Sequence, residues 1–203
     1  TIDGKTSVAV GATAITELTG NATNIKTALA SSGITTVTNG SLAVNVNSGT
    51  ASVADINTIN ADSATGIVTA TATETAAATL IGLTTTGTDA ITVTMAAAST
   101  AAADLNTIDG KTSVAVGATA ITELTGNATD VKTALASSGI TTVTNGSLAV
   151  NVSGSTSVAD INIINSDSAT GIVTATATET AAATLIGLTT TGTDAITVTM
   201  AAA

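Results

Sequence analysis

The sequence consists of two nearly identical tandem repeats, and this repetition constrains the fold more than any other feature. Residues 1–45 return as residues 107–151 with two substitutions, and after one deletion near residue 47 the copies stay in step. The two substitutions are Asn24→Asp130 and Ile25→Val131. Tandem copies this similar are typical of repeat proteins, in which each unit packs against the next. We therefore expect repeat 1 at residues 1–106 and a shorter repeat 2 at residues 107–203.

The missing residue types exclude most kinds of catalysis. The chain has no His, Cys, Trp, Tyr or Phe. His and Cys supply the usual general base, the activated thiol and most transition-metal ligands. Aromatic side chains supply the surfaces on which bases and sugars stack. We therefore expect a protein that is not an enzyme, with no catalytic residue and no cofactor-binding residue.

Carboxylates are the remaining candidates for acid–base chemistry. Four glutamates stand alone, without a second carboxylate at a fixed local spacing: Glu17, Glu74, Glu123 and Glu179. General acid–base catalysis needs a positioned partner group. We expect these glutamates to be solvated or to cap helices.

The charge balance excludes two classes of partner. The net charge is −10, so the chain repels nucleic-acid backbones and anionic membranes. Only 9% of residues are charged and 44% are hydrophobic, which favours a folded chain over a disordered acidic tail. No stretch is long and apolar enough for a transmembrane helix. We expect neither nucleic-acid binding nor membrane insertion.

Alternating apolar residues predict strands with one buried face. In residues 67–73 the residues Val68, Ala70 and Ala72 share one face, and threonines share the other. The same alternation occurs in residues 42–46 and 91–95.

Capping residues predict short helices after these strands. Asn21, Ser52 and Ser99 are good N-caps, because their side-chain oxygens accept hydrogen bonds from free amides of the first turn. We expect Gly33 to end the first helix in a left-handed conformation.

A repeated strand–helix unit cannot bury its apolar face alone, so its copies must stack. The predicted fold is a β/α solenoid, with one continuous parallel sheet on one side and short helices on the other. The alternative is an all-β parallel β-helix, in which the Ala/Thr-rich segments are loops. Either fold leaves open strand edges, which we expect near Thr1 and Ala203.

Aspartates at helix and turn positions are candidate calcium ligands, because calcium prefers oxygen donors. The candidates are Asp55, Asp62, Asp160 and Asp167. The sequence lacks the spacing of known calcium loops, so the favoured interpretation is that these residues serve helix starts and turns. A calcium-stabilised adhesin spacer stays an alternative function.

Threonines in Thr-x-Thr runs suggest a second alternative, an ice-binding solenoid. A flat, stacked Thr-x-Thr face resembles the ice-binding surface of insect and bacterial antifreeze proteins. The candidate residues are Thr69, Thr71, Thr73, Thr92, Thr94, Thr174, Thr176, Thr178, Thr197 and Thr199. Thr is also simply a good strand former on a half-exposed face.

The sequence of the repeats resembles that of giant secreted surface and matrix proteins of bacteria, cyanobacteria in particular. The motifs on which the resemblance rests are LTGNAT, which begins at Leu18, ALASSGIT, which begins at Ala28, and AADLNTID, which begins at Ala102. The resemblance implies an extracellular, cell-surface location and a structural, adhesive or motility-associated role. The function we expect is a structural repeat segment that forms a rigid rod or a self-stacking filament. Its expected partner is itself, through end-to-end or lateral stacking.

Overall fold

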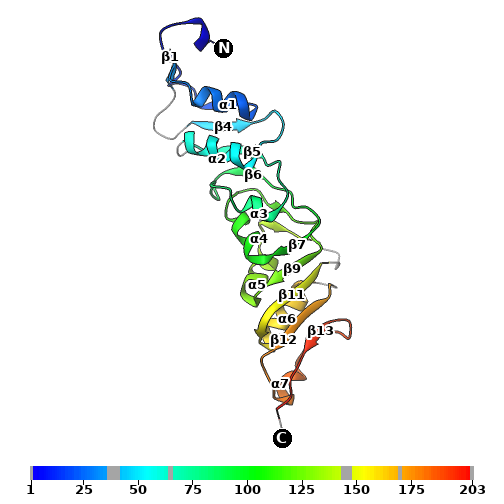
Figure 1. The fold of residues 1–203 in the computed structure, drawn as a ribbon. Helices are drawn as coiled ribbons and strands as arrows, with labels where there is room; N and C mark the ends of the chain where they lie inside the picture. The colour runs from blue at the N-terminus through cyan, green and yellow to red at the C-terminus, as the bar shows by residue number, and fades with distance from the viewer. Residues whose placement is uncertain (1, 36–41, 64–65, 143–147, 169–170, 202–203) are drawn as a thin grey trace. The chain divides into compact units, whose positions relative to one another are not determined.

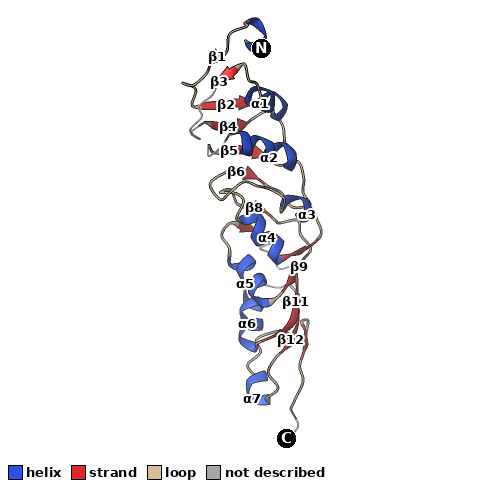
Figure 2. Ribbon diagram, turned by 60° about the vertical axis from the view of Figure 1, so that its left-hand side comes forward, coloured by secondary structure: helices blue, strands red, loops and turns tan. Residues whose placement is uncertain are grey.

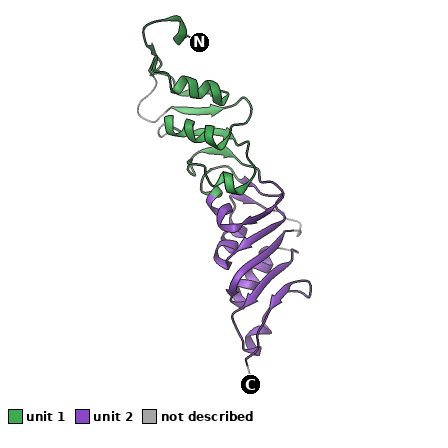
Figure 3. Cartoon of the chain, viewed as in Figure 1, with its two compact units in different colours: residues 1–94, 108–115 green, residues 95–107, 116–203 purple. Residues whose placement is uncertain are grey.

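One or two strands separate successive short helices along the chain in both repeats (Figures 1 and 2). This computed structural model describes residues 2–35, 42–63, 66–142, 148–168 and 171–201. Two compact units divide it (Figure 3). Unit 1 comprises Thr1–Thr94 and Ile108–Ala115, and unit 2 comprises Met95–Thr107 and Val116–Ala203.

Unit 1 contains two parallel sheets. The larger has the strand order β2-β4-β5-β6, and the smaller pairs β1 with β3. The strands are β1 (Val10–Gly11), β2 (Glu17–Gly20), β3 (Ile34–Thr35), β4 (Ala43–Val46), β5 (Val68–Thr71) and β6 (Ala90–Thr92). The helices are η1 (Asp3–Lys5), α1 (Ala22–Leu29), α2 (Val53–Asp62) and α3 (Ala77–Leu80).

Unit 2 repeats this plan with one more strand. Its larger sheet has the order β13-β12-β11-β9-β7, and β10 pairs with β8. The strands are β7 (Ser99–Ala101), β8 (Val116–Gly117), β9 (Glu123–Gly126), β10 (Ile140–Thr141), β11 (Ala149–Thr156), β12 (Val173–Ala177) and β13 (Ala195–Thr197). The helices are α4 (Ala102–Asp109), whose last two residues belong to unit 1, α5 (Ala128–Ala136), α6 (Val158–Asp167) and α7 (Ala182–Leu185).

The predicted alternation of buried and exposed residues is confirmed. On β5 and just beyond it, Val68, Ala70 and Ala72 are buried, whereas Thr69 and Thr71 are exposed. Val44 and Ile91, on the flanking strands, are also buried. The core is therefore made of aliphatic side chains, which parallel pairing of the strands brings together.

The solenoid prediction is wrong, and so is the parallel β-helix alternative. The described strands form four separate parallel sheets combined with helices, which is a mixed α/β fold, instead of one continuous sheet. The first split lies between β1 and β2. Val10 pairs with Ile34, whereas Glu17 pairs with Ala43, so β1 and β2 belong to different sheets.

A side chain ends the larger sheet of unit 1 at β6. The backbone N–H of Ile91 donates to the Thr112 hydroxyl oxygen at 3.0 Å, and that hydroxyl donates to the Ile91 carbonyl at 2.7 Å. A further strand would need these same backbone groups. Because one hydroxyl already binds both, the pairing prediction made from strand patterns alone overextends the sheet.

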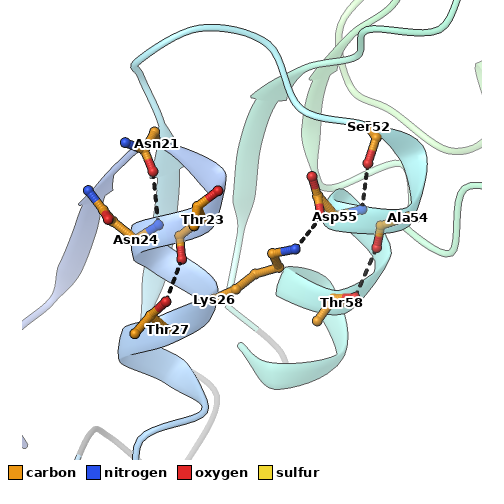
Figure 4. Close-up of polar contacts among 9 residues, drawn as sticks. All are labelled: Asn21, Thr23, Asn24, Lys26, Thr27, Ser52, Ala54, Asp55 and Thr58. Atoms are coloured by element: carbon orange, nitrogen blue, oxygen red, sulfur yellow. Dashed lines mark hydrogen bonds and ion pairs between the residues drawn. The ribbon is translucent and has the colours of Figure 1, made fainter.

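Two of the three predicted N-caps are confirmed. The Asn24 amide donates to the Asn21 side chain at 2.8 Å, and the Asp55 amide donates to the Ser52 hydroxyl at 3.1 Å (Figure 4). Ser99 is not an N-cap, because it begins β7, and its hydroxyl donates to a Glu123 carboxylate oxygen at 2.7 Å. Pairing with β9 therefore takes precedence over capping at this position.

Gly33 also differs from its prediction, because it does not adopt a left-handed conformation. It is needed for a close approach: a β-carbon at this position would lie 2.0 Å from Oδ1 of Asp3. The Asp3 carboxylate accepts a hydrogen bond from the Ser31 hydroxyl at 2.7 Å. Gly33 thus makes room for a side chain that closes the loop after α1.

Candidate functional site

A lysine–aspartate pair joins neighbouring helices at the same place in both repeats. Lys26 extends from α1 to Asp55 in the first turn of α2 (Figure 4). Lys132 and Asp160 repeat the pair between α5 and α6. The hydrogen bond from Lys26 lowers the pKa of Asp55 below its ordinary value of 3.8, and Lys132 does the same for the pKa of Asp160. No local sequence pattern indicates this pairing, because Lys26 and Asp55 lie 29 residues apart on different helices.

The calcium candidates do not converge on one point. Asp55 lies in the first turn of α2 and Asp62 is its last residue, so about 10 Å of helix separates them at 1.5 Å per residue. Asp160 and Asp167 have the same placement on α6. The described residues contain no group of three or more acidic side chains that is placed to hold a metal ion. The calcium alternative stays a prediction that would need ligands from elsewhere.

Asparagines of α2 bind the backbone of the loop that follows α3. The Asn57 side chain donates to the Gly82 carbonyl at 2.8 Å and accepts from the Thr84 amide at 2.8 Å. Asn162 makes the equivalent contacts in unit 2, with Gly187 and Thr189. Each asparagine therefore ties its helix to the backbone of the loop after the next helix in the chain.

Asp89 and Asp194 are polar anchors that the sequence analysis missed. The Asp89 carboxylate is buried and accepts from the amides of Val68 at 2.9 Å and Thr86 at 2.8 Å. Burial works to raise the pKa of Asp194, but hydrogen bonds from Val173 and Thr191 outweigh it and hold this pKa below 3.8. The available signal was the TGTD turn directly before a strand.

The capping role is confirmed for two of the four glutamates. Glu74 accepts from the Val53 amide at 2.9 Å, and Glu179 accepts from the Val158 amide at 3.0 Å. Each therefore satisfies a free amide at the start of a helix that precedes it in the chain. Glu123 accepts instead from Ser99, and Glu17 is exposed.

The Thr-x-Thr runs lie together on two neighbouring strands of each large sheet. Thr71 is the register partner of Thr92, but Thr69 lies between Asn45 and Ala90. The second copy repeats this arrangement, with Thr176 opposite Thr197 and with Thr174 between Asn151 and Ala195. Four candidates follow the ends of these strands and are exposed: Thr73, Thr94, Thr178 and Thr199. The ice-binding alternative stays a prediction, carried by a threonine surface that is two strands wide.

Matching residues of the two copies differ sharply in exposure. Met95 is 2% exposed, whereas the matching Met200 is 57% exposed. Val93 is 2% exposed, whereas the matching Val198 is 45% exposed. The side chains are the same in each pair, so the difference comes from what covers them.

Near the N-terminus the exposure differs in the opposite direction, and residues of the first copy are more exposed than their counterparts in the second. Ile15 and Leu18 are half-buried, whereas their counterparts Ile121 and Leu124 are buried. A hollow of about 330 Å³ adjoins α1 and is lined by Asp3, Asn24, Thr27, Ala28, Ser31 and Ile34.

Thr1 and Ala203, where open edges were predicted, lie outside the described residues. In the described sheets, β2 is an edge strand of the larger sheet of unit 1, and β13 is an edge strand of the larger sheet of unit 2.

None of the described helices has the length and apolar character needed to cross a membrane. Comparison of the chain with protein families, with curated proteins and with solved structures finds no match.

Proposed function

We propose that this chain is a structural repeat segment of a large extracellular protein, and that copies of the repeat assemble with one another. The observation that carries the proposal is the contrast between Met95 and Met200, one buried and the other exposed at matching positions. A repeat whose apolar side chains are buried only where another repeat continues is suited to being covered by further copies.

The expected assembly is open-ended. The exposed apolar residues near the N-terminus, Ile2 and Val8, differ from those near the C-terminus, Val198 and Met200. Contacts between unlike surfaces are heterologous, and heterologous contacts that do not close into a ring continue into filaments. Exposed edges of parallel strands add backbone hydrogen-bonding groups to such a contact.

The chemistry of the chain supports an extracellular structural role. It lacks the residues on which most catalysis depends, and its net charge of −10 repels nucleic acid. The side chains of Asp55, Asn57 and Glu74 are engaged in ties within unit 1 instead of converging on a shared site. The resemblance of the repeats to giant bacterial surface proteins suggests where such an assembly would work.

Sedimentation velocity and electron microscopy across a dilution series test the proposal. The unaltered chain should form assemblies that grow with concentration. Val198→Asp combined with Met200→Asp places charges on exposed apolar positions and should weaken assembly. The control pair Asn47→Asp and Ser48→Asp adds the same charge at exposed loop positions and should leave assembly intact. A chain that stays monomeric at every concentration would remove the proposal.

A further inference from the structure

Unit 2 shows how one strand–helix segment covers the edge of the next copy. β7 and β9 lie side by side (Figure 1) and pair in parallel. Their register places Thr100 opposite Leu124. The Thr122 amide donates to the Ala98 carbonyl at 3.0 Å. Ala102 and Leu105, from the part of α4 in unit 2, are buried. Residues 98–106 thus supply both a strand and an apolar helix face.

Polar contacts fix this segment in register. The Ser99 hydroxyl donates to Glu123 at 2.7 Å, and the Asn106 side chain donates to the Asp130 carbonyl at 3.0 Å. One contact lies at the start of β7 and the other on α4, so the segment is held at both ends.

Unit 1 presents the same acceptor residues without this cover. Residues 1–45 match residues 107–151 except at two positions, and both substitutions keep the acceptor surface. Ile25 and Val131 are both buried and aliphatic. Asn106 binds the backbone carbonyl of Asp130. The matching Asn24 has the same backbone group, so this contact does not depend on the side chain at that position.

The uncovered surface has the features that the covered one uses. β2 is an edge strand of its sheet, and Glu17, the counterpart of Glu123, is exposed. Ala28 is half-buried beside the hollow, whereas its counterpart Ala134 is buried. We call β2 together with the hollow along α1 the acceptor edge.

We infer that the acceptor edge binds the strand–helix segment of a further copy of the repeat, a segment equivalent to residues 99–106 that is not already paired with its own β9. The bound segment adds a parallel strand beside β2 and seats the counterpart of Leu105 against α1. This inference rests on the proposed assembly, because it names which segment and which edge meet. The match between residues 1–45 and 107–151 selects a second copy over an unrelated partner.

A chain extended by its own sequence tests the inference. Residues 99–106 (STAAADLN) are fused to the N-terminal side of Thr1, because Asn106 directly precedes the matching Thr107. The tether gives the added segment a high effective concentration at the acceptor edge. Amide hydrogen exchange at Thr16, the counterpart of Thr122, should slow by about tenfold or more, and exchange along β2 should slow with it.

The matched control carries Leu105→Asp in the added segment only, so the acceptor edge itself is unaltered. This control should leave exchange at Thr16 at the rate of the unextended chain. Unchanged exchange in the extended chain, or equal slowing by both segments, would overturn the inference.

The outcomes separate this inference from the proposed function. Slowed exchange in the extended chain, together with an unextended chain that stays monomeric, supports the acceptor edge and removes the proposed assembly. Concentration-dependent assembly with no slowing at Thr16 keeps the proposed function and overturns the acceptor edge. Assembly that the extension blocks supports both.

Discussion

Met95 and Met200 occupy the same place in the two copies, yet the first side chain is 2% exposed and the second is 57% exposed. Both belong to unit 2, so they can be compared within one folding unit. Replacing a buried methionine by alanine removes its transfer free energy and leaves a cavity. An exposed methionine has neither contribution to lose.

We therefore predict that Met95→Ala lowers the free energy of unfolding by about 2–5 kcal/mol. Met200→Ala should change it by less than about 0.5 kcal/mol. Urea unfolding followed by circular dichroism, at concentrations too low for assembly, measures both. Equal losses of unfolding free energy for the two variants would show that Met200 is as well covered in solution as Met95, and would contradict the prediction.

The elements were predictable from the sequence because their causes are local. Alternation of side chains predicts β5, and the Asn21 and Ser52 caps predict where α1 and α2 begin. The division into sheets was not predictable in this way, because it depends on long-range contacts. Thr112 hydrogen-bonds to Ile91, and nothing in the local sequence distinguishes this threonine from the others.

Thr112→Val tests whether this hydroxyl terminates the sheet. The valine is similar in shape but leaves the N–H and C=O groups of Ile91 without the partner they have in the folded chain. An unsatisfied buried polar group costs about 1–3 kcal/mol, so unfolding should become easier by about that amount.

The first copy provides the control for Thr112. Thr6 occupies the matching position and is exposed, and in the described part of the chain its hydroxyl exchanges hydrogen bonds with Val8. Thr6→Val should cost less than about 0.5 kcal/mol, because water replaces the lost contacts. If Thr112→Val proves as harmless as Thr6→Val in chemical denaturation, the Thr112 hydroxyl does not hold the edge of β6.

Gly171 is required by a close approach of two backbone segments. A β-carbon at this position would lie 1.9 Å from the Leu148 carbonyl oxygen, and a backbone atom cannot swing aside as a flexible side chain does. Gly171→Ala should therefore destabilise unit 2 by at least the ~1–3 kcal/mol typical of overpacking.

Gly192 is the matched control in the same unit, because a β-carbon there would meet nothing within 4 Å. Gly192→Ala should be neutral or slightly stabilising, since alanine restricts the unfolded chain more than glycine does. Thermal unfolding of the two variants separates these expectations. A melting temperature of Gly171→Ala equal to that of the parent would contradict the contact between residues 148 and 171.

The candidate site was only partly predictable, for a related reason. The sequence names Asp55 as a candidate calcium ligand or helix-start residue, but its partner Lys26 lies on the preceding helix, and the pairing depends on how α1 and α2 pack. Asp89 acts through backbone amides of Val68 and Thr86, and a sequence shows no pattern for the first of these contacts. Side-chain contacts within a helix turn can be predicted, whereas those between turns of different elements need the fold.

The lysine–aspartate pairs should make stability depend on pH in a defined window. Lys26 and Lys132 hold the pKa values of Asp55 and Asp160 below 3.8, so each ionised carboxylate is favoured in the folded state. A lowered folded-state pKa stabilises the protein above the unfolded-state value, and this contribution disappears as the pH falls through the folded-state value. Each pair is about one-third exposed, at 33% for Lys26 and Asp55, so we expect about 0.2–1 kcal/mol per pair at pH 7.

The double variant Lys26→Gln/Lys132→Gln should therefore be less stable than the parent at pH 7, and the deficit should shrink as the pH falls below 3.8 through the lowered folded-state pKa values of the two aspartates. The control Lys5→Gln/Lys111→Gln changes the net charge equally and alters residues with no ion pair among those that the structure describes. Urea unfolding at a series of pH values gives the difference between the two double variants, which removes the general effect of charge repulsion. A difference that stays constant from pH 7 to pH 2 would show that the lysines stabilise the helices by packing alone, without help from the ionised aspartates.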